Sequence, residues 1–468
     1  MQSSLVIARL NGSRLIGIGA WSLAISGVLP WFTAGAMSQQ ILGGRGWIAL
    51  IAGLVAMWWH YRPLRIERVS PTVVIVGAAG VGLLTGLSGL VVQPAALGAS
   101  VGVAVCIVGS LLLGIGAVIS LRGADESEGG VETEKTEPAS ASTAGRAARA
   151  AAYTLLVALG VLVIWPASPG DLSARAEPNT SYDDAVALFE ATTADEAGRI
   201  FEPCESQLMT HGEKVDVAVV LFHGLTNCPK QFVEFGSQLH DSGANVLILR
   251  APGHGVANET GDAIGGLSNV AGLTADELRE YADIAIDIGV GLGDDVRVLG
   301  LSMGGVIATW VAQERPDVQR VVAAAPAMTI PGVPAFLTNV LRNVGNKLPN
   351  IDLPGRSKLD HAYSGQTTKG LTATFLMADY VATSAYDRGP AAQDVIVVLN
   401  PDDDQVDPTH LAAFAERWAD HGETVSLYRL PAVGLPHDVI DPAQPSGNVD
   451  LIYPILLGLL AHGEASES

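Results

Sequence analysis

The ten residues VRVLGLSMGG, numbered 296–305, contain the strongest structural signal of this 468-residue chain. The apolar run Val296–Leu299 is typical of a buried strand, and the apolar residues 306–312 are typical of a buried helix. Between them lies Gly300-x-Ser302-x-Gly304, a pattern that predicts a sharp turn from strand to helix. Glycine on both sides relieves backbone crowding, and the turn would present the Ser302 hydroxyl above a helix N-terminus. Ser302 is therefore a candidate nucleophile.

Strand and helix patterns alternate on both sides of this turn. Such alternation predicts an α/β fold with a mostly parallel sheet and helices on both faces. Ser181 and Thr274 are candidate helix N-caps, and Glu277 completes a capping box with Thr274. The further strands are expected at Val215–Phe222, Asn245–Leu249, Val318–Ala325, Val395–Leu399 and Thr424–Leu430, and the further helices at Tyr182–Glu190, Lys230–Ser242, Pro408–His421 and Asn448–Leu460.

One interval, residues 328–390, breaks this alternation. It is proline-rich and irregular, and it falls between the predicted strands Val318–Ala325 and Val395–Leu399. An insertion there would lie over the carboxyl ends of the strands, where such sheets bind their ligands. We therefore expect a small cap at about 328–390.

The base that activates a serine hydroxyl is expected late in the chain, on a loop after the last strand. His437 occupies that place, and a carboxylate is needed to orient it. The loop after Val395–Leu399 offers Asp402, Asp403, Asp404 and Asp407. Asp404 fits best because Val406 follows it by two residues, whereas Asp403 and Asp407 remain alternatives. The chain order Ser302, Asp404, His437 is that of the α/β-hydrolase arrangement.

Two backbone N–H groups are candidates for an oxyanion hole. One belongs to Met303, which follows the nucleophile, and the other to Leu225, on the loop after Val215–Phe222. His223 begins that loop, and we expect it to fix the loop rather than to act as the base, which is the alternative. Pro252-Gly253-His254-Gly255 is expected to be a shaped turn.

The N-terminal third is strongly apolar and predicts an all-α transmembrane region of about five helices. Each apolar segment is close to the twenty or so residues that cross a bilayer. The segments are Leu15–Ala34, Ile41–Trp59, Thr72–Val92, Ala95–Leu121 and Ala147–Trp165. The domain boundaries that follow are 1–167 for the membrane region, 168–210 for a linker and helical lead-in, and 211–468 for the catalytic domain.

Arginine placement predicts the orientation of these spans. Arginine and lysine gather before the first span and in every second connection, whereas the other connections hold only Arg45. The N-terminus and the acidic loop 123–145, expected to be disordered, would then be cytoplasmic. The expected localisation is a multi-pass cell-membrane protein with its C-terminal domain outside the cytoplasm.

Charge and cysteine content exclude some functions. The residues after Ala167 include 17 basic and 41 acidic residues, so this part of the chain has a net charge of −24. Such a domain repels phosphate backbones, and nucleic acid is therefore not an expected partner. The chain has three cysteines, and nothing in the sequence resembles a cluster of metal ligands.

The C-terminal part resembles α/β-hydrolase serine esterases and lipases of the carboxylesterase and monoacylglycerol-lipase type. The matching motifs are His223-Gly224-Leu225-Thr226, Pro252-Gly253-His254-Gly255, Gly300-Leu301-Ser302-Met303-Gly304-Gly305, the aspartate-rich loop to Asp407, and Pro436-His437. The resemblance implies an acyl-enzyme at Ser302, oxyanion donors at Leu225 and Met303, a cap and no cofactor. If the domain lies outside the cytoplasm, Cys204 and Cys228 are expected to form a disulfide.

The sequence thus predicts a membrane-anchored serine hydrolase of carboxylic, lipid-like esters. The same triad would serve an acyltransferase to an envelope acceptor or a peptidase. A non-catalytic membrane sensor or binding protein with a hydrolase fold is the non-enzymatic alternative, because a fold alone does not fix a function.

Overall fold

The structure is a computed structural model that divides into two units, Met1–Pro166 and Ala167–Ser468. In the second unit it describes residues 167–329, 335–355, 357, 359–422 and 424–463. In the first it describes only 20–22, 32–34, 37–39, 54–55, 79 and 98–99.

The five predicted spans therefore lie almost wholly outside the described residues. Residues 20–22, 54–55 and 79 are helical, whereas β1 (Phe32–Ala34), β2 (Met37–Gln39) and β3 (Gly98–Ala99) form a short antiparallel sheet. β1 replaces the end of the first predicted helix, where Pro30 interrupts the helical pattern. Among the residues described, no helix combines the length and the apolar character that crossing a bilayer requires.

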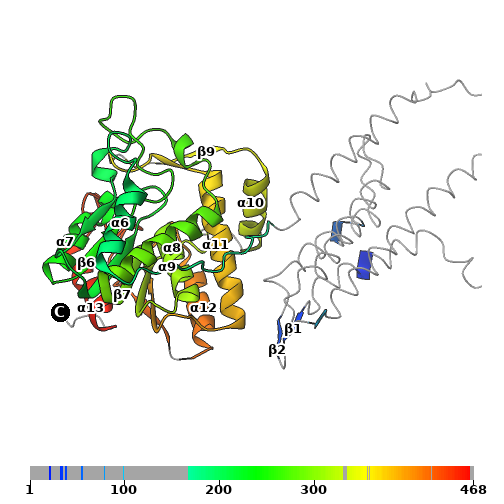
Figure 1. Ribbon diagram of the computed structural model, residues 1–468. Helices are drawn as coiled ribbons and strands as arrows, with labels where there is room; N and C mark the ends of the chain where they lie inside the picture. The colour runs from blue at the N-terminus through cyan, green and yellow to red at the C-terminus, as the bar shows by residue number, and fades with distance from the viewer. Residues whose placement is uncertain are drawn as a thin grey trace, which may run out of the picture. The chain divides into compact units, whose positions relative to one another are not determined.

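A seven-stranded sheet forms the centre of the second unit (Figure 1). Its strand order is β12-β11-β8-β7-β5-β6-β4. The strands are β4 (Gln207–Met209), β5 (Val215–Phe222), β6 (Asn245–Ile248), β7 (Gly293–Leu301), β8 (Arg320–Ala324), β11 (Asp394–Leu399) and β12 (Val425–Arg429). Every neighbouring pair is parallel except β4 with β6, which is antiparallel. This topology confirms the predicted α/β-hydrolase fold.

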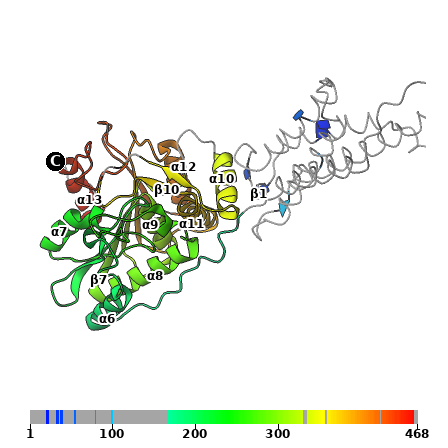
Figure 2. The ribbon, with the colours of Figure 1, turned by 90° about the horizontal axis from the view of Figure 1, so that it is seen from above.

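Both faces of the sheet are buried because the side chains of the strands alternate between two cores. In β5, Ala218, Val220 and Phe222 face one core, whereas Val219 and Leu221 face the other. The first core lies under α8 (Ala275–Leu292), α9 (Met303–Glu314) and α12 (Pro408–Ala419), and the second under α7 (Val233–Asp241) and α13 (Val449–His462). The two views of the ribbon show these helices on opposite sides of the sheet (Figures 1 and 2).

Two of the predicted helix starts have the expected capping bonds. Ser181 Oγ accepts from the Asp184 N–H at the start of α6 (Tyr182–Thr193). Thr274 and Glu277 form a complete capping box at the start of α8. These local patterns were readable because both partners lie within one turn of helix.

The insertion between β8 and β11 differs in part from the predicted cap. It contains α10 (Ala335–Lys347), a hairpin of β9 (Asp352–Pro354) and β10 (Gly365–Thr367), and α11 (Thr368–Asp387). The 20-residue helix α11 is not part of a loose lid, because its Leu376, Met377 and Val381 belong to the core shared with α8 and α9. The cap is therefore confined to the segment before α11.

Cys204 and Cys228 form a disulfide, the pairing that the sequence predicts if the domain lies outside the cytoplasm. Cys204 ends the short helix η3 (Glu202–Cys204), and Cys228 precedes η4 (Pro229–Phe232). Both cysteines are fully buried beside Ile200 and Phe201. The bond thus ties the lead-in segment to the loop that follows β5.

We predict that Cys204→Ala/Cys228→Ala lowers the free energy of unfolding by about 3 kcal/mol, because a cross-link over 24 residues restricts the unfolded chain. Urea unfolding of the purified C-terminal protein measures this loss. Dithiothreitol serves as the control, because reduction should lower the midpoint of the wild type and leave that of the double variant unchanged. Equal midpoints for the double variant and the wild type would contradict the stabilising role.

Candidate active site

Ser302 lies at the turn between β7 and α9 in a strained backbone conformation. Its φ is 61° and its ψ is −115°, a region that residues other than glycine seldom adopt. The turn is held from three sides. The Ser302 N–H donates to Ala324 O at 3.1 Å, while Ser302 O accepts from the N–H groups of Val306 at 2.9 Å and Ala327 at 3.1 Å. Hydrogen bonds to β8, to the segment after it and to α9 therefore fix a conformation that the isolated peptide would avoid.

The glycines of this turn are required by backbone contacts. A Cβ atom on Gly300 would come within 2.0 Å of Gly304 O, and a Cβ on Gly304 within 1.9 Å of Phe222 O. Neither distance is sterically possible, and both obstacles are main-chain atoms that no rotamer change can move. The Gly-x-Ser-x-Gly pattern is thus explained by the close approach of α9 to the end of β7 at Gly300 and to the end of β5 at Gly304.

The loop after β5 lies beside the nucleophile. A Cβ on Gly224 would be 3.7 Å from Ser302 Cβ. Leu225 N–H has no hydrogen-bond acceptor in the part of the chain that the structure describes. Met303 is the first residue of α9, so its N–H has no acceptor within the helix. These two N–H groups, both predicted from the sequence, are available to an oxygen atom bound at Ser302.

Two buried histidines hold this loop. His223 Nδ1 lies 2.9 Å from Gly224 O, and His223 Nε2 accepts the Ala251 N–H at 3.0 Å. His254 Nε2 lies 2.9 Å from Leu225 O, and its Nδ1 lies 3.0 Å from Pro252 O. Both rings have backbone partners, which agrees with the expectation that His223 and the Pro252–Gly255 turn shape the loop.

Burial keeps both of these rings neutral. It lowers the pKa of His254 to about 4 and that of His223 well below its usual value, and the nearby His254 further lowers the pKa of His223. A neutral His223 donates through Nδ1 and accepts through Nε2, which matches its two contacts. A neutral His254 donates to only one of the two carbonyl groups that it faces.

The carboxylate that contacts His437 is Asp403, not Asp404. His437 Nδ1 lies 2.8 Å from Asp403 Oδ2 and 3.0 Å from Oδ1, and both side chains are buried. Asp404 is exposed, and Asp407 caps α12 through the N–H groups of Thr409 and His410. Asp402 accepts the Gly434 N–H.

The reason for this difference is a local turn. Asp403 Oδ1 accepts the N–H groups of Gln405 at 2.8 Å and Val406 at 2.9 Å. This Asx-type turn directs the carboxylate of Asp403 inward and leaves the next residue outside. The buried Val406 therefore follows the inward aspartate by three residues rather than two.

The serine, aspartate and histidine follow β7, β11 and β12, whose carboxyl ends share one edge of the sheet. Gln231 joins two of the loops, because its Oε1 accepts the Gly224 N–H at 2.9 Å and its Nε2 donates to Asp438 Oδ2 at 2.8 Å. Ser302 Oγ makes no hydrogen bond within the described residues. Gln231 and Asp438 could not be identified from the sequence, since no motif relates residues 207 positions apart.

Among the described residues, no group of three or more His, Cys, Asp or Glu side chains has the arrangement of a metal site. The site instead combines a buried histidine–carboxylate pair, a hydroxyl on a strained turn and two unpaired N–H groups. Such a set is suited to acyl transfer.

The buried histidines predict a pH dependence of stability. Because the folded-state pKa of His254 lies below its unfolded value, its contribution is complete above pH 6.5 and is lost as the pH falls toward 4. We expect His254→Gln to reduce the slope of unfolding free energy against pH by about 1.4 kcal/mol per pH unit between pH 6 and 5. Urea unfolding at several pH values measures that slope.

His410→Gln is the matched control for this prediction, since His410 is exposed on α12 and should leave the slope unchanged. Comparison with a variant also cancels the opposite contributions of other groups. Parallel curves for wild type and His254→Gln would show that the His254 ring is not held neutral.

Comparison with known proteins agrees with this geometry. Residues 213–390 match the family model described as Serine aminopeptidase, S33. Over 155 residues the chain is 26% identical to a thermostable monoacylglycerol lipase from Bacillus sp. (strain H-257), which covers 31% of this chain. The match spans only 56% of that lipase's length.

Solved structures of lipolytic enzymes are also similar to the chain. One, from work on the metagenome-derived lipolytic enzymes LipS and LipT, has a TM-score of 0.43 and 17% identity, covering 56% of this chain and 99% of its own. The Paleococcus ferrophilus monoacylglycerol lipase has a TM-score of 0.41 and 17% identity, covering 55% and 97%. By its sheet topology, the turn at Ser302 and the match over residues 213–390, the C-terminal unit is an α/β-hydrolase domain similar to serine hydrolases of the esterase and lipase type.

Proposed function

We propose that the chain is a serine ester hydrolase with a triad of Ser302, His437 and Asp403. The observation that carries this proposal is the buried contact between His437 and Asp403 at the sheet edge where Ser302 is held in a strained turn. A domain that only bound a ligand would not need these three features together. The similarity to a monoacylglycerol lipase supports an ester, and a lipid-like one, as substrate.

In the proposed reaction, His437 Nε2 takes the proton of Ser302 Oγ as the oxygen attacks the ester carbonyl carbon. Asp403, held by the N–H groups of Gln405 and Val406, accepts the His437 Nδ1–H and stabilises the imidazolium. The carbonyl oxygen becomes an oxyanion and accepts hydrogen bonds from the N–H groups of Leu225 and Met303.

Collapse of this intermediate breaks the ester bond, and His437 gives its proton to the leaving alcohol. Water then attacks the acyl-enzyme with His437 as base, and the carboxylic acid leaves. An acceptor alcohol in place of water would give acyl transfer, so the two reactions differ only in the second nucleophile.

We further propose that the domain works outside the cytoplasm, anchored by the apolar N-terminal third. The Cys204–Cys228 disulfide supports an oxidising compartment. The alternation of arginine-rich connections supports the same orientation. In the first unit, three apolar residues with helical backbone are exposed: Trp21 (51%), Leu54 (49%) and Val55 (40%). Exposed apolar side chains of this kind suit contact with lipid.

We expect intact cells that express the full chain to be labelled by a membrane-impermeant fluorophosphonate, and Ser302→Ala to abolish this labelling, because only an activated serine reacts. Purified wild type should hydrolyse monoacylglycerols, and the variant should lose at least about 10⁴-fold of that rate. An aminoacyl arylamide and an added alcohol acceptor test peptidase and acyltransferase activity in the same assay.

Labelling only after cell lysis would contradict the extracytoplasmic location. If the folded wild type is labelled neither in cells nor in lysate, the hydrolase proposal is wrong and a binding role takes its place.

The identity of the triad acid is tested by two amide substitutions in adjacent residues. We expect Asp403→Asn to lower kcat for a p-nitrophenyl ester by about 10⁴-fold, because the amide no longer stabilises the His437 tautomer that the reaction needs. The matched Asp404→Asn removes an exposed carboxylate and should change kcat less than about threefold. The reverse order of these two effects would return the role to Asp404.

A further inference from the structure

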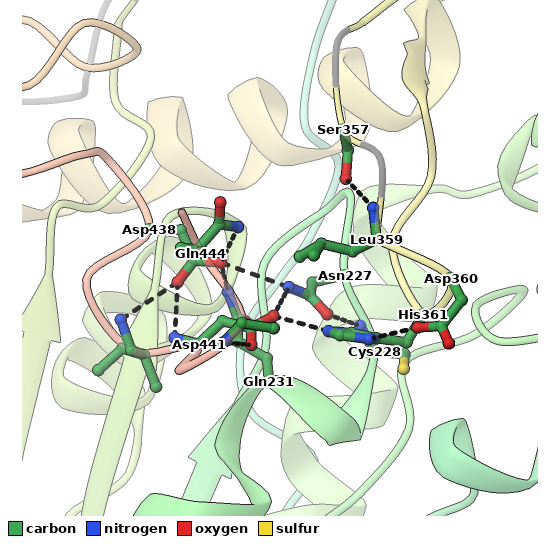
Figure 3. A network of polar contacts seen from close by, with 12 residues as sticks. Asn227, Cys228, Gln231, Ser357, Leu359, Asp360, His361, Asp438, Asp441 and Gln444 are labelled. Atoms are coloured by element: carbon green, nitrogen blue, oxygen red, sulfur yellow. Dashed lines mark hydrogen bonds and ion pairs between the residues drawn. The ribbon is translucent and has the colours of Figure 1, made fainter. Parts of the chain in front are cut away.

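A buried polar network joins the cap to the two loops of the proposed site (Figure 3). Its outermost member is His361, which lies between the β9 strand and the β10 strand and is 5% exposed. His361 Nε2 contacts Asp441 Oδ2 at 2.7 Å, and Nδ1 contacts Asp360 Oδ1 at 3.0 Å. The Asp441 side chain is 2% exposed, whereas that of Asp360 is 73% exposed. Asp441 is therefore the partner that matters energetically.

Asp441 belongs to the loop that carries His437. Its N–H donates to Asp438 Oδ1 at 3.1 Å, and its own Oδ1 accepts the Ala443 N–H at 3.0 Å. Gln444 Nε2 donates to Asp438 Oδ2 at 3.1 Å. These contacts form a compact turn directly after the candidate base, so that a displacement of Asp441 would be passed to His437.

The carboxylates of Asp438 and Asp441 also hold the oxyanion loop, which is the loop 223–228 after β5. Asn227 Nδ2 donates to Asp441 Oδ2 at 3.1 Å and to Asp438 Oδ2 at 3.3 Å. Gln231 connects Asp438 to the Gly224 N–H, next to Leu225. In Figure 3 the dashed contacts run from Asp438 through Asn227 and Asp441 to His361.

A second contact fixes the cap segment to this loop. The Tyr363 N–H donates to Thr226 O at 2.8 Å, one residue beyond Leu225. Cys204 Sγ lies 3.8 Å from His361 O, so the disulfide adjoins the same backbone. The segment 360–363 thus contacts both the oxyanion loop and the loop that carries His437, which is the base loop.

Within the described residues, His361 is the only basic side chain that pairs with the buried carboxylate of Asp441. Burial alone would lower its pKa, but Asp441 and Asp360 outweigh burial and raise the pKa above its usual 6.5. Burial likewise opposes ionisation of Asp441, yet the contacts with His361, Ala443 and Asn227 lower its pKa. Tyr453, a further titratable neighbour of this turn, donates its hydroxyl proton to Ile440 O.

We propose that His361 and Asp441 are positioning residues for the proposed hydrolytic reaction. While His361 is protonated, their ion pair holds the oxyanion loop and the loop of His437 in fixed positions relative to each other. This inference rests on the proposed function. Loss of the His361 proton leaves the Asp441 carboxylate buried without a counter-charge, and the cap segment then releases both loops. Activity therefore needs His437 neutral and His361 protonated.

The two requirements predict a bell-shaped dependence of kcat/KM on pH, with an acidic limb from His437 and a basic limb from His361. In His361→Gln, the amide still donates to Asp441 but has no proton to lose. We expect this variant to lose the basic limb and to have a kcat about tenfold below that of the wild type, with KM changed less than about twofold, because loop misplacement affects the reacting geometry.

Two further variants sharpen this test. Asp441→Asn should lower kcat as His361→Gln does, and the double variant should be no worse than Asp441→Asn, since both changes break one contact. Asp360→Asn is the matched control, because it removes the exposed carboxylate on the same ring and should retain the basic limb. Fluorophosphonate titration of each preparation counts the folded active sites. It therefore distinguishes a loss of kcat caused by misfolding from one caused by displacement of the two loops.

A basic limb that persists unchanged in His361→Gln, with wild-type kcat, would overturn the inference while leaving the hydrolase proposal intact. A wild type without Ser302-dependent turnover would overturn both. Additive losses in the double variant would show that the two residues act separately and would also refute the positioning pair.

Discussion

The close approach of α9 to the end of β5 is the contact on which the rest of the site depends. β5 and β7 are neighbours in the sheet, with Phe222 opposite Gly300, so the residues after both strands emerge side by side. A helix that starts directly after Ser302 then runs against Phe222 O, and only glycine at 304 leaves room for it. The same packing that forces a positive φ at Ser302 also brings the oxyanion loop beside the nucleophile. Strain at the serine is thus a consequence of how two adjacent strands end.

Most of the fold was predictable because its signals are local. The strands read as short apolar runs, the capping residues of α6 and α8 lie within one helical turn, and the motif at Ser302 combines a strand, a turn and a helix in ten residues. The cap was less predictable. The helix α11 follows a proline-rich stretch, and its burial against α8 and α9 depends on a surface that only tertiary packing supplies.

The site was predictable to the extent that its groups follow strands in a fixed order. The candidate serine and histidine could be chosen from that order, but the carboxylate that contacts His437 could not, because four aspartates share one loop. The choice of Asp403 is made by the Asx-type turn to Gln405 and Val406, which a pattern of residue types does not encode. The network of Asn227, Gln231, Asp438 and Asp441 was invisible for a different reason: its bonds join residues more than 200 positions apart.

These long-range contacts answer a physical problem of the fold. Loops are the least stable parts of a domain, yet an oxyanion donor that moves by about 1 Å loses much of its effect. The oxyanion loop is accordingly fixed by several groups: by the rings of His223 and His254, by Gln231, which also contacts Asp438 in the loop of His437, and by the disulfide from Cys228 to the lead-in. The cap segment adds two links, from Tyr363 N–H to Thr226 O and from His361 to Asp441, and the carboxylates beside His361 raise the pKa of its ring. A movement of a cap attached in this way would displace the loops that carry the proposed reacting groups, without any contact between the cap and those groups.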